Sequence, residues 1–228
     1  MNKNQYNELL KGFIEAGYNF TFFNQPISKK NQIILRHDVD YSCKSAYEIA
    51  KVELENSIFS TYFFMISNSM YNAFSLKNRE YIEKIKDMGH KISLHYDMAS
   101  GELEREIDIF EKFFKTKVEI LSIHRPNMES LDKITCVEHT YMKKYFKDIK
   151  YTSDSTGKFR YGHPFKTEEF RKNKSFQLLT HPEWWVTNIK SPVRILDNII
   201  KDEHYKINKF FIENSSIYRE RALREKNK

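Results

Sequence analysis

Short apolar runs alternate with amphipathic helical patterns along the first 180 residues of the chain. The clearest pair is the run ending IILRH, at residues 33–37, followed by a helical pattern at 43–55 with Ser42 as its N-cap. Buried strands that read as continuous apolar runs and are separated by helices are typical of a parallel sheet with helical crossovers. The pattern therefore predicts an α/β fold, and it leaves open a doubly wound sheet or a closed barrel.

The same alternation predicts the order of the elements. We expect helices at 1–18, 43–55, 78–90 and 101–115, strands at 32–37, 60–67, 91–97, 118–124, 149–154 and 176–181, and a mostly helical region from 196 onward. One face of the first helix should be buried, with Tyr6, Leu9, Leu10, Phe13 and Ile14. No proline-, glycine- or serine-rich boundary interrupts the chain, so we expect one domain over residues 1–228.

Composition narrows the class of protein. The chain has 18 Phe and 14 Tyr, enough for a packed core, and Cys43 and Cys136 are expected as buried reduced thiols. The net charge of +7 permits an anionic partner, but the lysines are scattered, so no nucleic acid is expected.

No run approaches the ~20 apolar residues of a membrane span. The first 18 residues form an amphipathic pattern without an apolar signal core, which predicts a cytoplasmic protein of undetermined oligomeric state.

Polar residues collect where the predicted strands end. In a parallel α/β fold these carboxyl ends share one edge, where ligands bind. Each residue has an ordinary structural explanation, such as the N-cap of the next helix for an aspartate. Convergence of five strand ends indicates one shared site, formed by Asp38, Asp40, His95, His124, Arg125, Asp154 and His181.

Histidine and aspartate together suit zinc or another first-row divalent metal. A further carboxylate can act as a base and a further histidine as an acid, which is the arrangement of a metal-assisted amide or ester hydrolase. The chain has no glycine-rich phosphate loop and no GxSxG motif, and neither cysteine follows a strand beside a histidine. Nucleotide cofactors and serine or cysteine nucleophiles are therefore disfavoured.

The motifs RHDVD, GHKISLHYD, SIHRPN, SDSTGKFR and LLTHPEWW together resemble, in order, those of the polysaccharide deacetylase family, the NodB-homology or carbohydrate esterase 4 group. The chain looks most similar to a divergent cytosolic branch that carries HDVD. This resemblance implies a single-domain distorted (β/α) barrel of about seven parallel strands, with its motif-bearing core at about 33–185 and helical additions at both ends. It also implies a divalent metal, with zinc favoured over cobalt, nickel or manganese, and removal of acetyl groups from N-acylated sugars.

The family's motifs assign roles to five residues of this sequence. By resemblance, Asp38 is the catalytic base and Asp40 a metal ligand. Arg125 matches the arginine that orients the base. Asp154 matches the residue that positions the acid, and His181 matches the general acid.

The second family motif is only half present. His95 matches its first metal-binding histidine, but the second falls on Ala99, which cannot bind a metal. His124, at the end of a neighbouring predicted strand, is the preferred replacement. The alternatives are His37 and Asp97.

Three further expectations concern the substrate and the alternatives to a hydrolase. Trp184 and Trp185 are candidates to stack on a sugar ring, against the alternative that they pack in the core. The expected substrate is a nucleotide-linked or lipid-linked sugar in surface-polysaccharide biosynthesis. The loss of a ligand at Ala99 leaves two alternatives open: a catalytically impaired carbohydrate-binding protein, and, from the charge alone, an anion-binding module.

Overall fold

The structure is a computed structural model that describes residues 1–160 and 162–226. The chain divides into two compact units, residues 1–188 and 189–228. The second unit contains helices α8 (Pro192–Asn214) and α9 (Ser216–Lys226), in the region where the sequence predicts helix. Within the described residues, no helix combines the length and apolar character needed to cross a membrane. The expected single domain over 1–228 stays a prediction.

One sheet of eight strands organises the first unit, and its strand pairs are parallel. The strand order is β6-β5-β4-β3-β2-β8-β7, with β1 paired to β2 beside β3. This confirms the predicted α/β fold. The strands are β1 (Asn19–Thr21), β2 (Gln32–Val39), β3 (Thr61–Phe64), β4 (Lys91–Asp97), β5 (Ile120–His124), β6 (Glu138–His139), β7 (Lys150–Ser153) and β8 (Phe176–Thr180).

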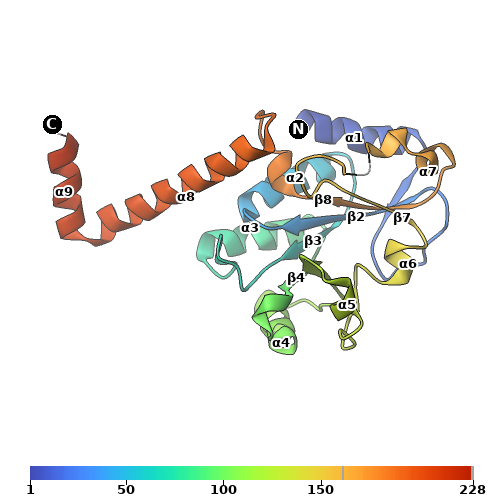
Figure 1. Cartoon of the computed structure of the whole chain (residues 1–228), viewed down its shortest axis with the longest axis horizontal. Coiled ribbons are helices and arrows are strands. Elements are labelled where there is room, and N and C mark those ends of the chain that lie inside the picture. Colours follow the sequence, from blue (N-terminus) through green and yellow to red (C-terminus); the bar gives the residue numbers. More distant parts are fainter. Residues whose placement is uncertain (161, 227–228) are drawn as a thin grey trace. The chain divides into compact units, whose positions relative to one another are not determined.

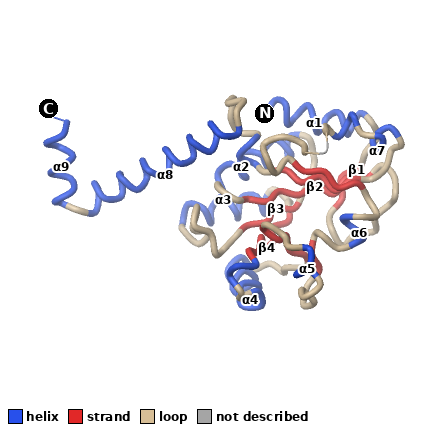
Figure 2. The backbone as a smooth tube through the Cα atoms, in the orientation of Figure 1, coloured by secondary structure: helices blue, strands red, loops and turns tan. Residues whose placement is uncertain are grey.

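The seven strands of the main path curl into a half-barrel with helices around it (Figures 1 and 2). Over the described residues, no strand pairing joins β6 to β7, so the barrel is open between them. The Gln177 side chain of β8 reaches across the curl and donates to the carbonyls of Thr140, at 3.0 Å, and Tyr145, at 2.6 Å. The distorted barrel of about seven parallel strands is therefore confirmed.

Helices cover the sheet and bury apolar faces against it. The main core packs α2, α3 and α4 against strands β2 to β5. Ser42 accepts a hydrogen bond from the Ser45 backbone, which confirms it as the N-cap of α2. The helices of this unit are α1 (Lys3–Glu15), α2 (Cys43–Glu55), α3 (Leu76–Asp87), α4 (Leu103–Phe114), α5 (Met128–Leu131), α6 (Lys143–Phe146) and α7 (Glu168–Arg171), with 3₁₀ turns η1 (Met98–Ser100), η2 (Pro164–Lys166) and η3 (Pro182–Trp184).

Several details differ from the sequence-based expectations. Strands β1 and β6 were not predicted, because three and two residues are too few to show a periodicity. Ile14 is 43% exposed although it was expected on the buried face of α1. Cys43 is buried and Cys136 is exposed, and both are free thiols. The prediction of a buried Cys136 is therefore wrong.

Candidate active site

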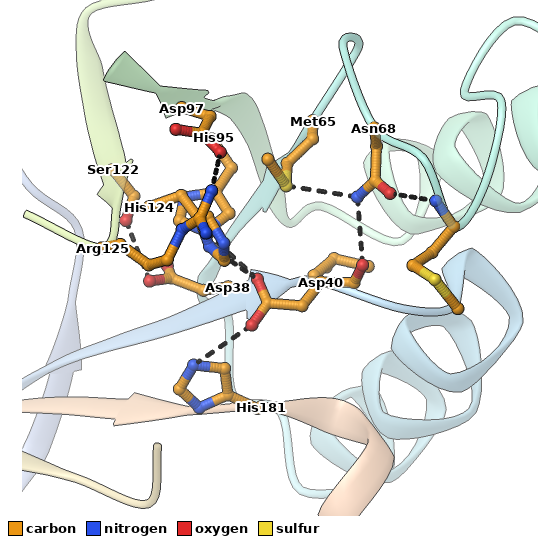
Figure 3. A network of polar contacts seen from close by, with 12 residues as sticks. Asp38, Asp40, Met65, Asn68, His95, Asp97, Ser122, His124, Arg125 and His181 are labelled. Carbon is orange, nitrogen blue, oxygen red and sulfur yellow. Dashed lines mark hydrogen bonds and ion pairs between the residues drawn. The ribbon is translucent and has the colours of Figure 1, made fainter. Parts of the chain in front are cut away.

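The carboxyl ends of the strands bring the predicted residues to one edge of the barrel. Figure 3 shows the side chains of Asp38, Asp40, His95, His124 and His181 grouped there. Each lies in the last part of a strand or directly after it, and the carboxyl ends of parallel strands share one edge of the sheet. The strands concerned are β2, β4, β5 and β8, and Asp154 follows β7, which pairs with β8 at the end of the sheet.

Asp40 is the centre of a candidate metal site. Its Oδ1 lies 3.2 Å from Nε2 of His95 and 3.6 Å from Nδ1 of His124. The three ligand atoms lie within 4.8 Å of one another. Burial opposes ionisation of Asp40, but the contacts with His124 and His95 outweigh it and lower the pKa of the carboxyl. One carboxylate and two imidazoles form a donor set that suits zinc, and this group fits the implied metal.

The two alternative metal ligands are engaged in contacts with other residues. His37 is fully buried, with Nε2 2.6 Å from Oε1 of Glu53. Asp97 accepts a hydrogen bond of 2.6 Å from the Arg125 guanidinium. The grouping of the described residues thus favours His124 as the third ligand.

Asp38 is buried and only partly hydrogen-bonded. Its Oδ2 accepts hydrogen bonds from the Ser122 hydroxyl, at 2.9 Å, and from the Arg36 guanidinium, at 3.3 Å. Its Oδ1 is buried without a hydrogen-bond partner. Burial disfavours the charged form of Arg36, but Asp38 and the nearby Tyr141 outweigh it and raise the pKa of the guanidinium. Asp38 therefore has one oxygen held in place and one oxygen free to accept a proton.

Arg125 does not make the contact expected of it. Its side chain is 72% exposed and pairs with Asp97, while the arginine that contacts Asp38 is Arg36. The reason is local backbone geometry, because Arg125 has a left-handed φ of 49° directly after β5, where the chain turns away. The expected contact of Arg125 with Asp38 is therefore corrected, because Arg36 makes this contact instead.

Asp154 holds His181 in one orientation. The Nδ1 of His181 donates to Oδ1 of Asp154 at 2.7 Å, and the indole of Trp185 donates to Oδ2 at 2.6 Å. The Nε2 of His181 then faces Oδ2 of Asp40 at 3.8 Å. Burial lowers the pKa of His181, but the hydrogen bond and charge of Asp154 dominate and raise it to about 10. His181 is thus protonated near neutral pH.

The two tryptophans do not form a sugar platform. Trp184 is 4% exposed and Trp185 is 2% exposed, so neither ring face is open to a ligand. Trp185 packs on Tyr6, with ring centroids 5.2 Å apart, and holds Asp154. The prediction of sugar stacking by Trp184 and Trp185 is wrong, and the core-packing alternative holds.

Sequence reasoning missed three residues of the site. Arg36 and Ser122 each lie two residues before an identified site residue, Asp38 and His124, and the two-residue period of a strand places them on the same face. Glu183 is 3% exposed, with its Oε1 unpartnered. Burial is the main cause that raises the pKa of Glu183 to about 8. No sequence pattern predicts that Glu183 is buried, because its position depends on the 3₁₀ turn η3.

The loop after β3 also contacts the site. Asn68 donates to the backbone carbonyl of Asp40 at 3.0 Å, and a contact of 3.2 Å joins its amide to the Met65 sulfur (Figure 3). The segment that carries Asp40 is therefore held from outside the sheet as well as by β2.

Comparison with known proteins gives similarities to solved structures only. No family model matches the chain, and no curated protein matches it in sequence. The chitin deacetylase of the fungal pathogen Colletotrichum lindemuthianum is 14% identical, with 78% of this chain and 86% of that chain covered and a TM-score of 0.43. The deacetylase PplD of Streptococcus pyogenes, in complex with acetate, is 13% identical over 87% of each chain, with a TM-score of 0.47.

A third similar structure is a family 4 carbohydrate esterase from Bacillus anthracis, at 16% identity. It covers 87% of this chain and 86% of its own, with a TM-score of 0.45. All three are named as deacetylases or as a family 4 carbohydrate esterase, the group that the sequence motifs resemble.

Proposed function

We propose that this protein is a metal-dependent hydrolase that removes an acyl group, in the first instance acetyl, from an N-acylated sugar. One observation carries the proposal. A carboxylate with a free oxygen, Asp38, and a protonated imidazole, His181, lie beside the same Asp-His-His group. A base, an acid and a metal site at one strand edge are the components of amide hydrolysis by metal and acid–base catalysis.

The metal would be held by Asp40, His95 and His124. Zinc with three protein ligands keeps a fourth position for water or substrate, and the bound ion supplies Lewis acidity that polarises the acyl carbonyl. Oδ1 of Asp40 is buried and faces the nitrogens of His95 and His124, at 3.2 and 3.6 Å, without hydrogen-bond geometry to either, as expected of an atom that would share a cation with them. Cobalt, nickel and manganese remain alternatives to zinc in this proposal.

Asp38 acts as the base. Ser122 and Arg36 hold its Oδ2, so Oδ1 keeps the lone pairs that accept a proton from the attacking water. The buried Arg36 guanidinium contacts Oδ2 of Asp38 and restricts rotation of the carboxylate. A fixed carboxylate loses less entropy when the water is positioned for attack.

His181 acts as the acid. Asp154 accepts a hydrogen bond from Nδ1–H of His181, so the second N–H of the imidazolium is on Nε2, on the side of Asp40. That Nε2–H can donate to the departing sugar nitrogen, which would otherwise leave as an unstable amide anion. Trp185 contributes by fixing Asp154 rather than by touching the sugar.

Metal binding and acyl hydrolysis test the proposal together. Metal-free protein should bind zinc in a calorimetric titration, and bound cobalt should give tetrahedral absorption bands. His124→Ala should weaken metal binding strongly, whereas Asp97→Asn, the matched change at the alternative ligand, should leave it nearly unchanged. Acetate release from a panel of N-acetylated sugars should depend on added metal.

One alternative keeps a specific observation in its favour. Ala99 occupies the position where the resembling family has its second histidine, and a missing ligand can leave a carbohydrate-binding protein without turnover. Tight zinc binding with no acyl release from any sugar in the panel would favour this alternative. Failure to bind any of the four metals would contradict the proposed hydrolase. The nucleotide-linked or lipid-linked substrate, the role in surface-polysaccharide biosynthesis and the cytoplasmic location stay predictions.

A further inference from the structure

A large groove lies away from the active-site edge. It has a volume of about 1090 Å³ and is lined by residues around Lys150 and Ser175. Lys150 is the first residue of β7, and Ser175 directly precedes β8, so the groove lies at the amino ends of strands whose carboxyl ends carry Asp154 and His181. Figure 1 shows α6 and α7 on the same side of the molecule as β7.

The groove is strongly cationic. Seven of its lining residues are lysines, against the two carboxylates of Asp148 and Glu169. Those carboxylates are already paired, Asp148 with Lys143 at 2.5 Å and Glu169 with Lys150 at 3.1 Å. Lys172 is also paired, with Glu168 at 2.5 Å, so the lining lysines without an ion pair among the described residues are Lys29, Lys30, Lys147 and Lys174.

The fold places like charges side by side in this groove. Lys30 and Lys174 pair their backbones in an antiparallel bridge, although 144 residues separate them in the sequence (174 − 30). The backbone of Ser175 also donates to the carbonyl of Lys29 at 3.1 Å, which brings a third lysine to the same place. Like charges directly opposite each other across a bridge are destabilising, and an anion between them relieves the repulsion.

The composition of the groove favours one kind of anion. Its described lining residues include no arginine and no glycine, so it has neither a guanidinium fork nor a glycine-rich backbone nest for phosphate. Its aromatic rings, Phe146 and Tyr151, pack on each other with centroids 4.8 Å apart, so they are not free platforms for nucleic-acid bases. Lysines spread over separate segments instead suit a linear ligand whose charges are spaced along its length.

We propose that this groove binds a linear acidic polysaccharide through its carboxylates. The preference for a polyanion follows from the lysines, whereas the choice of a carbohydrate rests on the proposed function. The site anchors the polymer at the amino-end side of the barrel, separate from the residues that carry out the reaction.

Equilibrium binding with a defined probe tests this proposal. Fluorescently labelled polygalacturonate should bind the full-length protein, and binding should weaken as salt is added. The double variant Lys30→Glu/Lys174→Glu should bind about tenfold more weakly or worse, with a shallower salt dependence, since each lost cationic contact lowers the salt slope by about one. The matched control Lys77→Glu/Lys133→Glu changes the net charge equally at exposed sites outside the groove and should bind like the parent.

Two outcomes would overturn the proposal. Equal loss in the groove and control variants would show that only net charge attracts the polymer. Tighter groove-dependent binding of oligothymidylate or inorganic polyphosphate than of polygalacturonate would assign the groove to phosphate-bearing ligands instead. Acetate release from a small N-acetylated sugar, measured on the same samples, reports on the proposed function independently of the groove.

Discussion

Two buried polar clusters share strand β2 and differ in how completely their atoms are paired. Successive side chains of a strand point to opposite faces, so Arg36 and Asp38 face the active site while His37 faces the other way. We call the second group the rear cluster. Its members are Tyr6, His37, Glu53, Ser60, Tyr62 and His90, each buried.

The rear cluster has no unpaired buried atom within the described residues. Glu53 accepts hydrogen bonds from the hydroxyls of Tyr6, Ser60 and Tyr62, the last two at 2.6 and 2.9 Å. His37 lies 2.6 Å from Glu53 through Nε2 and 2.8 Å from the Thr180 hydroxyl through Nδ1. The cluster thereby joins α1 and α2 to three strands of the sheet.

The active-site cluster leaves buried atoms without partners. These include Nε and Nη1 of Arg36, Oδ1 of Asp38, Nδ1 of His95 and Oε1 of Glu183. An unpaired buried polar atom costs roughly 1–3 kcal/mol, so a fold that keeps several at one edge is arranged for a ligand that completes them. A fully paired cluster thus holds the structure together, whereas a partly unpaired one offers atoms for binding and catalysis.

The largest expected effect is the loss of turnover when a residue of the active-site cluster is replaced. Asp38→Asn and His181→Ala should each lower kcat for acyl release by about 10²–10⁴-fold, the usual contribution of a catalytic base or acid. Thermal unfolding followed by circular dichroism should show both variants folded. Asp87→Asn, an exposed change on α3, is the matched control and should keep full activity. Undiminished turnover in both site variants would remove the acid–base assignment.

Breaking the rear cluster should reduce stability instead. Glu53→Gln leaves the buried His37 without its charge partner, and loss of one member of a buried pair costs about 3–5 kcal/mol. Urea unfolding measures this change. Glu48→Gln on the same helix removes pairs with Lys3 and Lys51 that are largely exposed, and it should cost less than about 1 kcal/mol.

A double variant makes the stability test specific to the pair. In Glu53→Gln/His37→Gln, the imidazole that lost its partner is also gone, so part of the stability should return. Equal stability of Glu53→Gln and Glu48→Gln would contradict the view that the rear cluster holds the fold.

The two arginines near the site should differ in their effect on turnover. Arg36→Gln should lower kcat by about 10–100-fold, because a hydrogen bond to a charged group is worth about 1.5–3 kcal/mol. Arg125→Gln removes an exposed pair with Asp97, worth about 0–1 kcal/mol, and should change kcat little. Steady-state kinetics on one acetylated sugar compares them, and a larger loss at Arg125 would restore the role that the motif resemblance gave it.

The smallest expected effect is the acid sensitivity of the rear cluster. Burial raises the pKa of Glu53, but the charge and hydrogen bond of His37 outweigh it and lower the pKa from 4.5 to about 2. Because the pKa of Glu53 is lower in the folded than in the unfolded chain, its ionised carboxylate stabilises the fold. This contribution is complete above about pH 4.5 and is lost as the pH falls through about 2. Urea unfolding between these pH values should therefore show a flatter pH dependence for Glu53→Gln than for Glu48→Gln. Parallel pH profiles would show that Glu53 is not ionised in the folded protein.

Much of the site could be predicted because it follows from strand periodicity and strand direction. Asp38, Asp40, His95, His124 and His181 end apolar runs, and parallel strands place such ends together. The same reasoning failed for Trp184 and Trp185, because a strand pattern does not show which way the turn after it points. It also failed for Glu53, which reads as an ordinary polar position of an amphipathic helix yet is fully buried.

Spacing along the chain is enough to predict the alternation of strands and helices and the edge at which the site residues gather. The arginine that contacts Asp38, the pairing on each face of β2 and the contact of Lys30 with Lys174 follow only from the folded chain. These depend on the curl of the barrel and on contacts between distant segments, and local periodicity contains no information about either.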